Sequence, residues 1–179
     1  IRDRYRQEGK NTSHITDISI KKDSNNSKSH FFTNTVAKLN LTYFENSELE
    51  FNLETTSNDN YLKSHKIKSA ITNNNSLLNS LLLLKGNNED LYLEAKVEAY
   101  EDLTKEKTSD KYQFLLPSFE LSKSFNNNLS LTSNGYQKNY DTNVFEKVLI
   151  NDLKYTSSPK INSKGLVSKL NLLFKNITT

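Results

Sequence analysis

The feature that most constrains the fold is the alternation of residues 91–100, LYLEAKVEAY. Every odd position is apolar, and every even position is polar or amphipathic. Successive side chains of a β-strand point to opposite faces, so this segment predicts a strand with one apolar and one polar face. Such an apolar face meets either a protein core or the hydrocarbon of a membrane.

The same period of two recurs along the chain, and polar clusters rich in Asn, Ser and Lys separate its instances. Alternating stretches lie at 17–20, 35–43, 48–54, 119–121, 129–131 and 166–175. Short strands separated by polar turns are typical of antiparallel hairpins. We therefore predict an all-β fold, an antiparallel up-and-down meander of about ten strands. It forms one domain over residues 1–179, with no separate second domain.

Membrane helices are not expected, because the longest uninterrupted apolar run is Leu81–Leu84. The strands of a membrane β-barrel need only about 9–11 alternating residues. The expected connections also alternate in length, as in outer-membrane barrels. Shorter ones fall at 44–47, 86–90 and 123–127, and longer ones at 22–29, 57–76, 101–111 and 138–143. The pattern favours part of a large transmembrane β-barrel, although 157–163 is longer than a tight turn.

In such a barrel, the alternation assigns one set of side chains to the lipid and the other to the lumen. The set predicted to face lipid is Leu39, Leu41, Leu49, Phe51, Leu53, Leu91, Leu93 and Val97. The set predicted to face the lumen is Lys38, Asn40, Glu48, Glu50, Asn52, Glu94, Lys96 and Glu98.

Several residues have more than one interpretation. Segment 77–84, LLNSLLLL, fits a helical turn or a buried strand. Phe31 and Phe32 fall on opposite faces of a strand start, so one of them is a candidate for the membrane interface. Tyr92 and Tyr100 lie on the polar face, which favours packing in the lumen or at a loop base. Pro117 is expected near the start of its strand, where its missing N–H is tolerated.

Motifs of catalysis and of cofactor binding do not occur. His14, His30 and His65 are dispersed, without metal-ligand spacing, and are expected to be polar or loop histidines. The four glycines are isolated, so no loop that cradles phosphate is predicted. No cysteine is present to form a disulfide or a thiolate site. We expect no enzymatic activity, no cofactor and no catalytic or metal site.

Charge excludes a further class of partner. The chain has 24 basic and 21 acidic residues, and the Lys and Arg residues are scattered along it. A nucleic-acid-binding protein concentrates its basic residues on one face. No nucleic-acid partner is therefore expected.

Four segments together resemble the barrel domain of the LptD family (also called OstA or Imp), the outer-membrane lipopolysaccharide-assembly proteins. They are LEFNLETTSNDNYL (49–62), AYEDLT (99–104), YQFLLPSFELSKSF (112–125) and NGYQKNYDTNVFEKVLINDLKY (134–155). The most specific parts are Ser57, Asn58, Asp59 and Tyr61, the LPSFELS strand, and the YQKNYDTN loop two strands later. The resemblance runs from about residue 4 to the end and is most similar in style to alphaproteobacterial members.

The resemblance implies a place in the outer membrane of a Gram-negative cell. Proteins of this family form a large barrel around the plug lipoprotein LptE. They receive lipopolysaccharide from a periplasmic bridge built of LptA and release it through a lateral opening. The chain is then expected to be a fragment of barrel wall, in contact with outer-membrane lipid and without catalytic function. The absence of Met likewise predicts a piece of a longer chain.

Two other protein classes share this alternation. One is another outer-membrane channel or receptor barrel, and the other is a soluble, adhesin-like β-sandwich that acts as a binding module. A sandwich folds its apolar faces against each other, whereas a barrel wall turns them all outward. For a stretch of barrel wall on its own, we expect an open, curved sheet with unpaired edges that aggregates in water.

Overall fold

The computed structural model describes residues 1–22, 27–72, 74–106, 108–126, 128–140 and 144–179. Within that part, ten strands form one antiparallel sheet. The strands are β1 (Arg2–Glu8), β2 (Thr12–Lys22), β3 (Ser27–Leu39), β4 (Asn46–Thr56), β5 (Leu77–Asn87), β6 (Leu91–Asp102), β7 (Tyr112–Asn126), β8 (Leu129–Tyr140), β9 (Phe145–Thr156) and β12 (Asn171–Thr178). Each strand from β1 to β8 pairs with the next along the chain, and β9 pairs with β12. The predicted all-β meander is confirmed.

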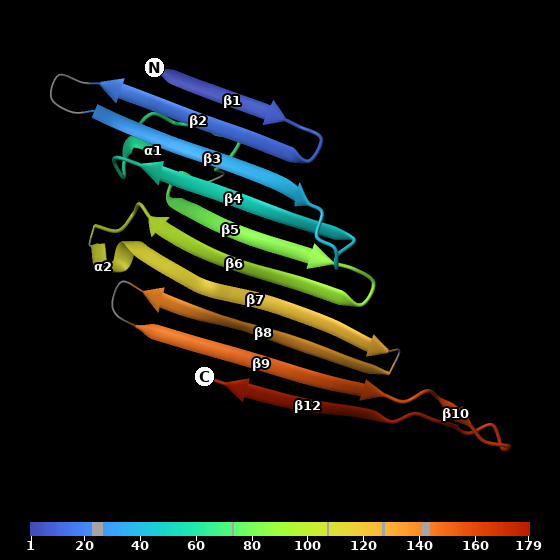
Figure 1. Ribbon diagram of the computed structural model, residues 1–179. Coiled ribbons are helices and arrows are strands. Elements are labelled where there is room, and N and C mark those ends of the chain that lie inside the picture. The colour runs from blue at the N-terminus through green and yellow to red at the C-terminus, as the bar shows by residue number, and fades with distance from the viewer. Residues whose placement is uncertain (23–26, 73, 107, 127, 141–143) are drawn as a thin grey trace.

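The sheet is open, with β1 at one edge and β12 at the other (Figure 1). Between β9 and β12 the chain forms a separate two-stranded ribbon of β10 (Lys160–Ile161) and β11 (Val167–Ser168). Two four-residue helices, α1 (Tyr61–Ser64) and α2 (Thr108–Lys111), lie at the opposite end of the sheet from this ribbon (Figure 1). The open sheet agrees with expectation, and membership of a closed barrel stays a prediction.

The strand predicted at 35–43 has different bounds. Strand β3 begins at Ser27 and ends at Leu39, so Asn40 and Leu41 lie in the turn before β4. There the Phe44 amide donates to the Leu41 carbonyl (3.0 Å), and the Ser47 hydroxyl donates to the Leu39 carbonyl (2.7 Å). These two bonds satisfy the backbone in a turn and end the ladder earlier than the alternation indicated.

Segment 77–84, whose sequence fits either a helical turn or a buried strand, belongs to strand β5. Strand β5 pairs with β4 on one side and with β6 on the other. Pro117, predicted near the start of a strand, lies in the middle of β7 instead. The pairing of β7 with β8 shifts register between Leu115 and Ser118, and this irregularity tolerates a residue without an N–H.

The predicted rhythm of the connections holds only in part. At the helix end of the sheet, 57–76 and 103–111 are long, as expected. The connections predicted at 22–29 and 138–143 are shortened because the flanking strands extend into them, and their remaining tips lie outside the described residues. At the other end, the short turns are 9–11, 40–45 and 88–90, and the segment suspected of being too long for a turn forms the ribbon.

A cluster of buried apolar side chains joins the sheet to residues 57–72, here called the strap, which contain α1. The cluster consists of Phe32, Tyr61, Leu62, Ile67, Leu78 and Leu103. Phe32 and Leu62 are completely buried. Phe32 pairs in register with Asp17 and Glu54, so this core lies on the face of the sheet that carries the polar residues of β4.

Candidate functional site

The register of the strands divides the sheet into two chemically different faces, because paired residues share a face. Leu49 pairs with Leu84, and Phe51 pairs with Leu82. The row continues to Val97 of β6, which pairs with Leu82. We call this side the apolar face. In its middle, Phe51 and Leu82 remain 42% and 44% exposed, and the described part of the chain has no second sheet packed against them.

Seven of the eight side chains predicted to face lipid share this apolar face: Leu39, Leu49, Phe51, Leu53, Leu91, Leu93 and Val97. Leu41 does not, because β3 has ended before it. It is 40% exposed in the turn beside Tyr43, which is 82% exposed. The placement of Leu41 in the strand was wrong because it extended the alternation through a turn, and its contact with lipid stays a prediction.

Polar groups interrupt the apolar face towards its two sides, which sequence reasoning missed. On β2 and β3, His14 Nδ1 lies 2.7 Å from the Thr35 hydroxyl, and the Thr16 and Thr33 hydroxyls lie 3.2 Å apart. On the other side, the Ser133 hydroxyl of β8 donates to Asn151 of β9 (2.7 Å). Each group bonds across strands within the sheet, which lowers the cost of an apolar environment.

Two glycines on the apolar face lie beneath aromatic rings. A Cβ atom on Gly86 would lie 2.7 Å from the ring of Phe44, which reaches over from the β3–β4 turn. A Cβ atom on Gly135 would lie 3.1 Å from the ring of its cross-strand partner Phe119. Rings placed over strand glycines replace the missing side chains and fix the register.

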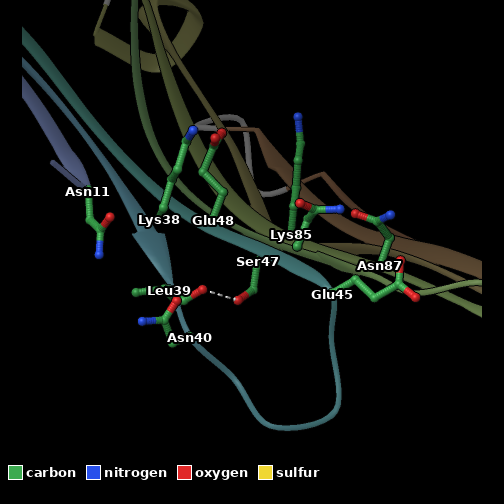
Figure 2. A pocket seen from close by; sticks show the side chains of 10 residues that line it. Asn11, Lys38, Leu39, Asn40, Glu45, Ser47, Glu48, Lys85 and Asn87 are labelled. Atoms are coloured by element: carbon green, nitrogen blue, oxygen red, sulfur yellow. Dashed lines mark hydrogen bonds between the residues drawn. The ribbon is translucent and has the colours of Figure 1, made fainter.

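The opposite side, here called the polar face, carries a row of alternating charge across four strands. In register order the row is Lys38 of β3, Glu48 of β4, Lys85 of β5 and Glu94 of β6. Figure 2 shows Lys38, Glu48 and Lys85 rising from the same side of the sheet. The Lys85 ammonium lies 4.0 Å from the Glu94 carboxylate. Opposite charges placed directly across strands stabilise the pairing.

This row borders an open depression of about 330 Å³ at the short-turn end of the sheet. Besides Lys38, Glu48 and Lys85, its lining includes Asn11 and Asn87 (Figure 2). Amides, ammonium groups and carboxylates together offer both donors and acceptors to a hydrated polar ligand. The depression therefore suits a hydrated polar group better than an apolar molecule.

Seven of the eight side chains predicted to face the lumen share the polar face: Lys38, Glu48, Glu50, Asn52, Glu94, Lys96 and Glu98. Asn40 lies in the turn instead, for the same reason as Leu41. Glu98 is only 6% exposed, and its burial is offset by a hydrogen bond from Tyr100 and an ion pair with Lys96 at 3.2 Å. Tyr92 likewise donates to Glu94 on this face.

The polar face is not uniformly polar. Leu81 pairs with Glu98 and Leu83 pairs with Lys96, so both leucines lie among the charged residues. Strand β5 therefore differs from the alternating strands, because it carries leucines on both faces. A run of four leucines has no alternation, so half of its side chains necessarily point to the polar side.

The strap covers the polar face at the helix end through a buried network of polar groups. Asp17 accepts hydrogen bonds from Arg2 at 3.0 and 2.6 Å and lies 3.2 Å from Nε2 of His30. The other ring nitrogen of His30 lies 3.1 Å from the Ser19 hydroxyl, which bonds the Tyr61 hydroxyl of the strap. Asp17, Ser19 and His30 are each at most 4% exposed.

The order serine, histidine and aspartate in this network resembles that of a nucleophile, its base and an orienting carboxylate. Burial gives it a different role here, because Ser19 lies under Tyr61 and no substrate reaches its hydroxyl in this conformation. The network binds the strap to β2 and β3. Sequence reasoning placed His30 among dispersed polar or loop histidines and missed its partners, since register alone brings residues 17 and 30 together.

Lys111 ties the second long connection to the strap. Its ammonium group at the end of α2 lies 2.7 Å from Asp59 and 2.9 Å from Glu101. Burial by itself lowers the pKa of Lys111, but the hydrogen bonds to Asp59 and Glu101 outweigh it, and the pKa is raised overall. Lys111 therefore stays charged at any physiological pH.

Among the described residues, no group of three or more His, Asp or Glu side chains is placed to hold a metal ion. The helices of the described residues are too short and too polar to cross a membrane. Comparison of the chain with family models, with curated proteins and with solved structures found no match. Functional inference therefore rests on the two faces, on the strap and on the sequence segments themselves.

Proposed function

We propose that this chain is part of the wall of an outer-membrane β-barrel of the LptD kind, through which lipopolysaccharide passes to the outer leaflet. The observation that carries the proposal is the exposed apolar face of a single-layered meander, opposite a charged face. Phe51 and Leu82 lie at the middle of β4 and β5, yet each is more than 40% exposed. Water is an unfavourable neighbour for such a face, and acyl chains are a favourable one.

The backbone supports a membrane environment as well. Hydrocarbon offers no hydrogen bonds, so every strand in it must be paired on both sides. All strands from β2 to β9 have two neighbours in the sheet. From β2 to β9 the strands contain between 11 and 15 residues, enough to span a bilayer when tilted. A soluble sandwich would instead place a second sheet about 10 Å from the apolar face.

The lipopolysaccharide part of the proposal rests on the four resembling segments and on the chemistry of the polar face. Lipopolysaccharide passing through a lumen presents hydroxyl and phosphate groups, which amides and ammonium groups bind. The row from Lys38 to Glu94 and the depression beside it supply such groups. The same face would meet the plug lipoprotein LptE, while LptA would deliver the lipid to other parts of the full protein. The chain acts as a conduit, without a catalytic step.

The membrane part is tested with single tryptophans, since the sequence contains none. Phe51→Trp and Glu50→Trp place the fluorophore on opposite faces at neighbouring positions of β4. After reconstitution into vesicles, brominated phospholipid should quench Phe51→Trp strongly, and a water-soluble quencher should act mainly on Glu50→Trp. Equal quenching at both positions contradicts the barrel wall, because the two faces would then share one environment.

The lipopolysaccharide part needs a separate measurement in Gram-negative cells. A photo-crosslinking residue at Lys96 or Glu98 should capture LptE or lipopolysaccharide, whereas the same residue at Val97, on the apolar face, should not capture LptE. Because Glu98 is buried, Glu48 serves as a more accessible second position on the polar face. Failure at all three polar positions, with tryptophan quenching as expected, would favour another outer-membrane channel or receptor.

A further inference from the structure

The ribbon between β9 and β12 is larger than its connecting role requires. It comprises residues 157–170 and extends past the end of the sheet (Figure 1). At the same end, three residues (9–11) suffice to connect β1 to β2, and three (88–90) connect β5 to β6. Strands β9 and β12 are also direct neighbours, so a turn of similar length would join them. The additional residues are therefore not required for the connection.

The ribbon has a defined structure held by its own hydrogen bonds. Its base is closed by Ser157, whose amide donates to the Leu170 carbonyl (2.8 Å) and whose hydroxyl accepts from the Leu170 amide (2.8 Å). At its tip, the side chain of Asn162 accepts from the amides of Lys164 and Leu166. Gly165 has a φ of 78°, a backbone conformation that residues with a side chain rarely adopt. The ribbon is therefore an ordered hairpin whose backbone hydrogen-bonding groups are largely paired within it.

The surface of the ribbon combines apolar side chains with positive charge. Residues 158–170 are all exposed. The exposed fractions are 72% for Ile161, 66% for Leu166, 59% for Val167 and 53% for Leu170. Lys160, Lys164 and Lys169 are interspersed among them, and residues 157–170 contain no Asp or Glu. The neighbouring turns at 40–45 and 88–90 each contain acidic residues.

The register arranges these side chains on the two sides of the ribbon. Ile161 pairs with Val167, so these two apolar side chains share one side. Lys160 pairs with Ser168 on the other side. Long lysine side chains can keep the ammonium group in a polar layer while their methylene groups accompany neighbouring apolar side chains. At the surface of a bilayer, the apolar side chains of this hairpin could therefore reach the acyl chains while its lysine ammonium groups stay at the level of the lipid phosphates.

We propose that the ribbon 157–170 is a membrane-surface anchor that binds anionic phospholipid. Ile161, Leu166, Val167 and Leu170 enter the boundary between headgroups and acyl chains, and the three lysines contact lipid phosphates. Charge complementarity selects this occupant, since three positive charges without any negative one match an anionic lipid surface. The inference does not depend on the proposed function, because the ribbon lies outside the sheet and its faces.

The test uses Leu166→Trp in the full chain, where it is the only tryptophan. With vesicles of equal parts phosphatidylcholine and phosphatidylglycerol, we expect a blue-shifted emission that brominated lipid quenches. Replacement of the three lysines (Lys160→Gln, Lys164→Gln, Lys169→Gln) should weaken vesicle binding of the ribbon by at least about tenfold. The matched control replaces three exposed lysines at the other end: Lys22→Gln, Lys63→Gln and Lys105→Gln. This control should leave the emission and the quenching of Leu166→Trp unchanged.

Two results would overturn the proposal. One is a Leu166→Trp emission that stays unshifted and unquenched with these vesicles, in which case the ribbon fits a protein surface instead. The other is equal quenching in pure phosphatidylcholine with no effect of the lysine replacements. Phe51→Trp in the same vesicles reports on the barrel wall separately. A quenched ribbon with an unquenched Phe51→Trp would retain the anchor and reject the proposed function.

Discussion

Asp17 illustrates how single residues of this sheet depend on their partners. Its side chain is 3% exposed and contacts Arg2, Arg4 and His30. A buried carboxylate is costly unless charged or hydrogen-bonding groups surround it, so the network is favourable only when complete. Arg2 and Arg4, which carry the positive charges next to Asp17, also donate hydrogen bonds to the Lys68 carbonyl of the strap. One carboxylate thereby links the edge strand, the sheet and the strap.

At Gly135 the sheet has no room for a side chain. A Cβ atom there would lie 2.7 Å from the Val148 carbonyl oxygen, a backbone atom that cannot rotate away. Gly135→Ala is therefore expected to lower the free energy of unfolding by about 1–3 kcal/mol. Asn134→Ala, one position earlier and on the opposite face, should change it by less than about 0.5 kcal/mol. Denaturant unfolding of both variants checks this, and equal midpoints would contradict the close approach.

At the scale of elements, the strap is structured by tertiary contacts. Helix α1 has four residues, far fewer than an isolated helix needs in water. It is held by the burial of Tyr61 and Leu62 against Phe32, together with the hydrogen bond between the hydroxyl groups of Tyr61 and Ser19. In a closed barrel, the strap would narrow the lumen at the helix end, because it lies on the polar face.

Leu62 tests this dependence directly, since it is fully buried and anchors the strap. Leu62→Ala should cost about 2–5 kcal/mol locally. The expected result is faster hydrogen exchange at the Ile67 amide, which bonds the Leu62 carbonyl, with unchanged exchange in β8 and β9. Leu77→Ala, at a 38% exposed leucine, is the control and should have little effect. Uniformly faster exchange throughout the sheet would mean that the strap is no separate unit.

At the scale of the whole molecule, the two edges of the sheet differ. The β1 edge carries Arg2, Arg4 and Arg6, and charged edge strands resist pairing with other chains. The β12 edge carries Leu172, Leu173, Phe174 and Ile177, which are between 41% and 64% exposed. With the apolar face also exposed, the isolated chain is expected to aggregate in water through β12 and this face.

Removal of apolar area from that face should reduce aggregation. Phe51→Ser combined with Leu82→Ser is expected to raise the soluble fraction in detergent-free buffer, since both side chains are more than 40% exposed. Sedimentation followed by circular dichroism of the supernatant measures this. Leu77→Ser combined with Leu81→Ser, on the polar face, should give no such gain. A loss of β structure in the first variant would show that Phe51 and Leu82 belong to a folded core after all.

Alternation alone predicted the class of fold, the meander and the face of most residues in β4 and β6, because side chains in strands point to opposite sides whatever they pack against. It was wrong at Asn40 and Leu41, where a turn ends the strand, and it assigned no face to Leu81 and Leu83, because four consecutive leucines carry no alternation. The alternation also did not predict Pro117 in the middle of β7, because that position depends on a register shift between β7 and β8.

Only the tertiary structure decided which residues cover the polar face at the helix end of the sheet. The contacts of Asp17 with His30, of Ser19 with Tyr61 and of Lys111 with Asp59 join residues between 13 and 52 positions apart. A local pattern contains no information on such pairs, because register and the fold of a long connection bring them together. By itself, the sequence determined that the chain forms a two-faced sheet. The strap required the whole fold, since its position depends on contacts between distant segments, whereas the ribbon is closed by hydrogen bonds among its own residues.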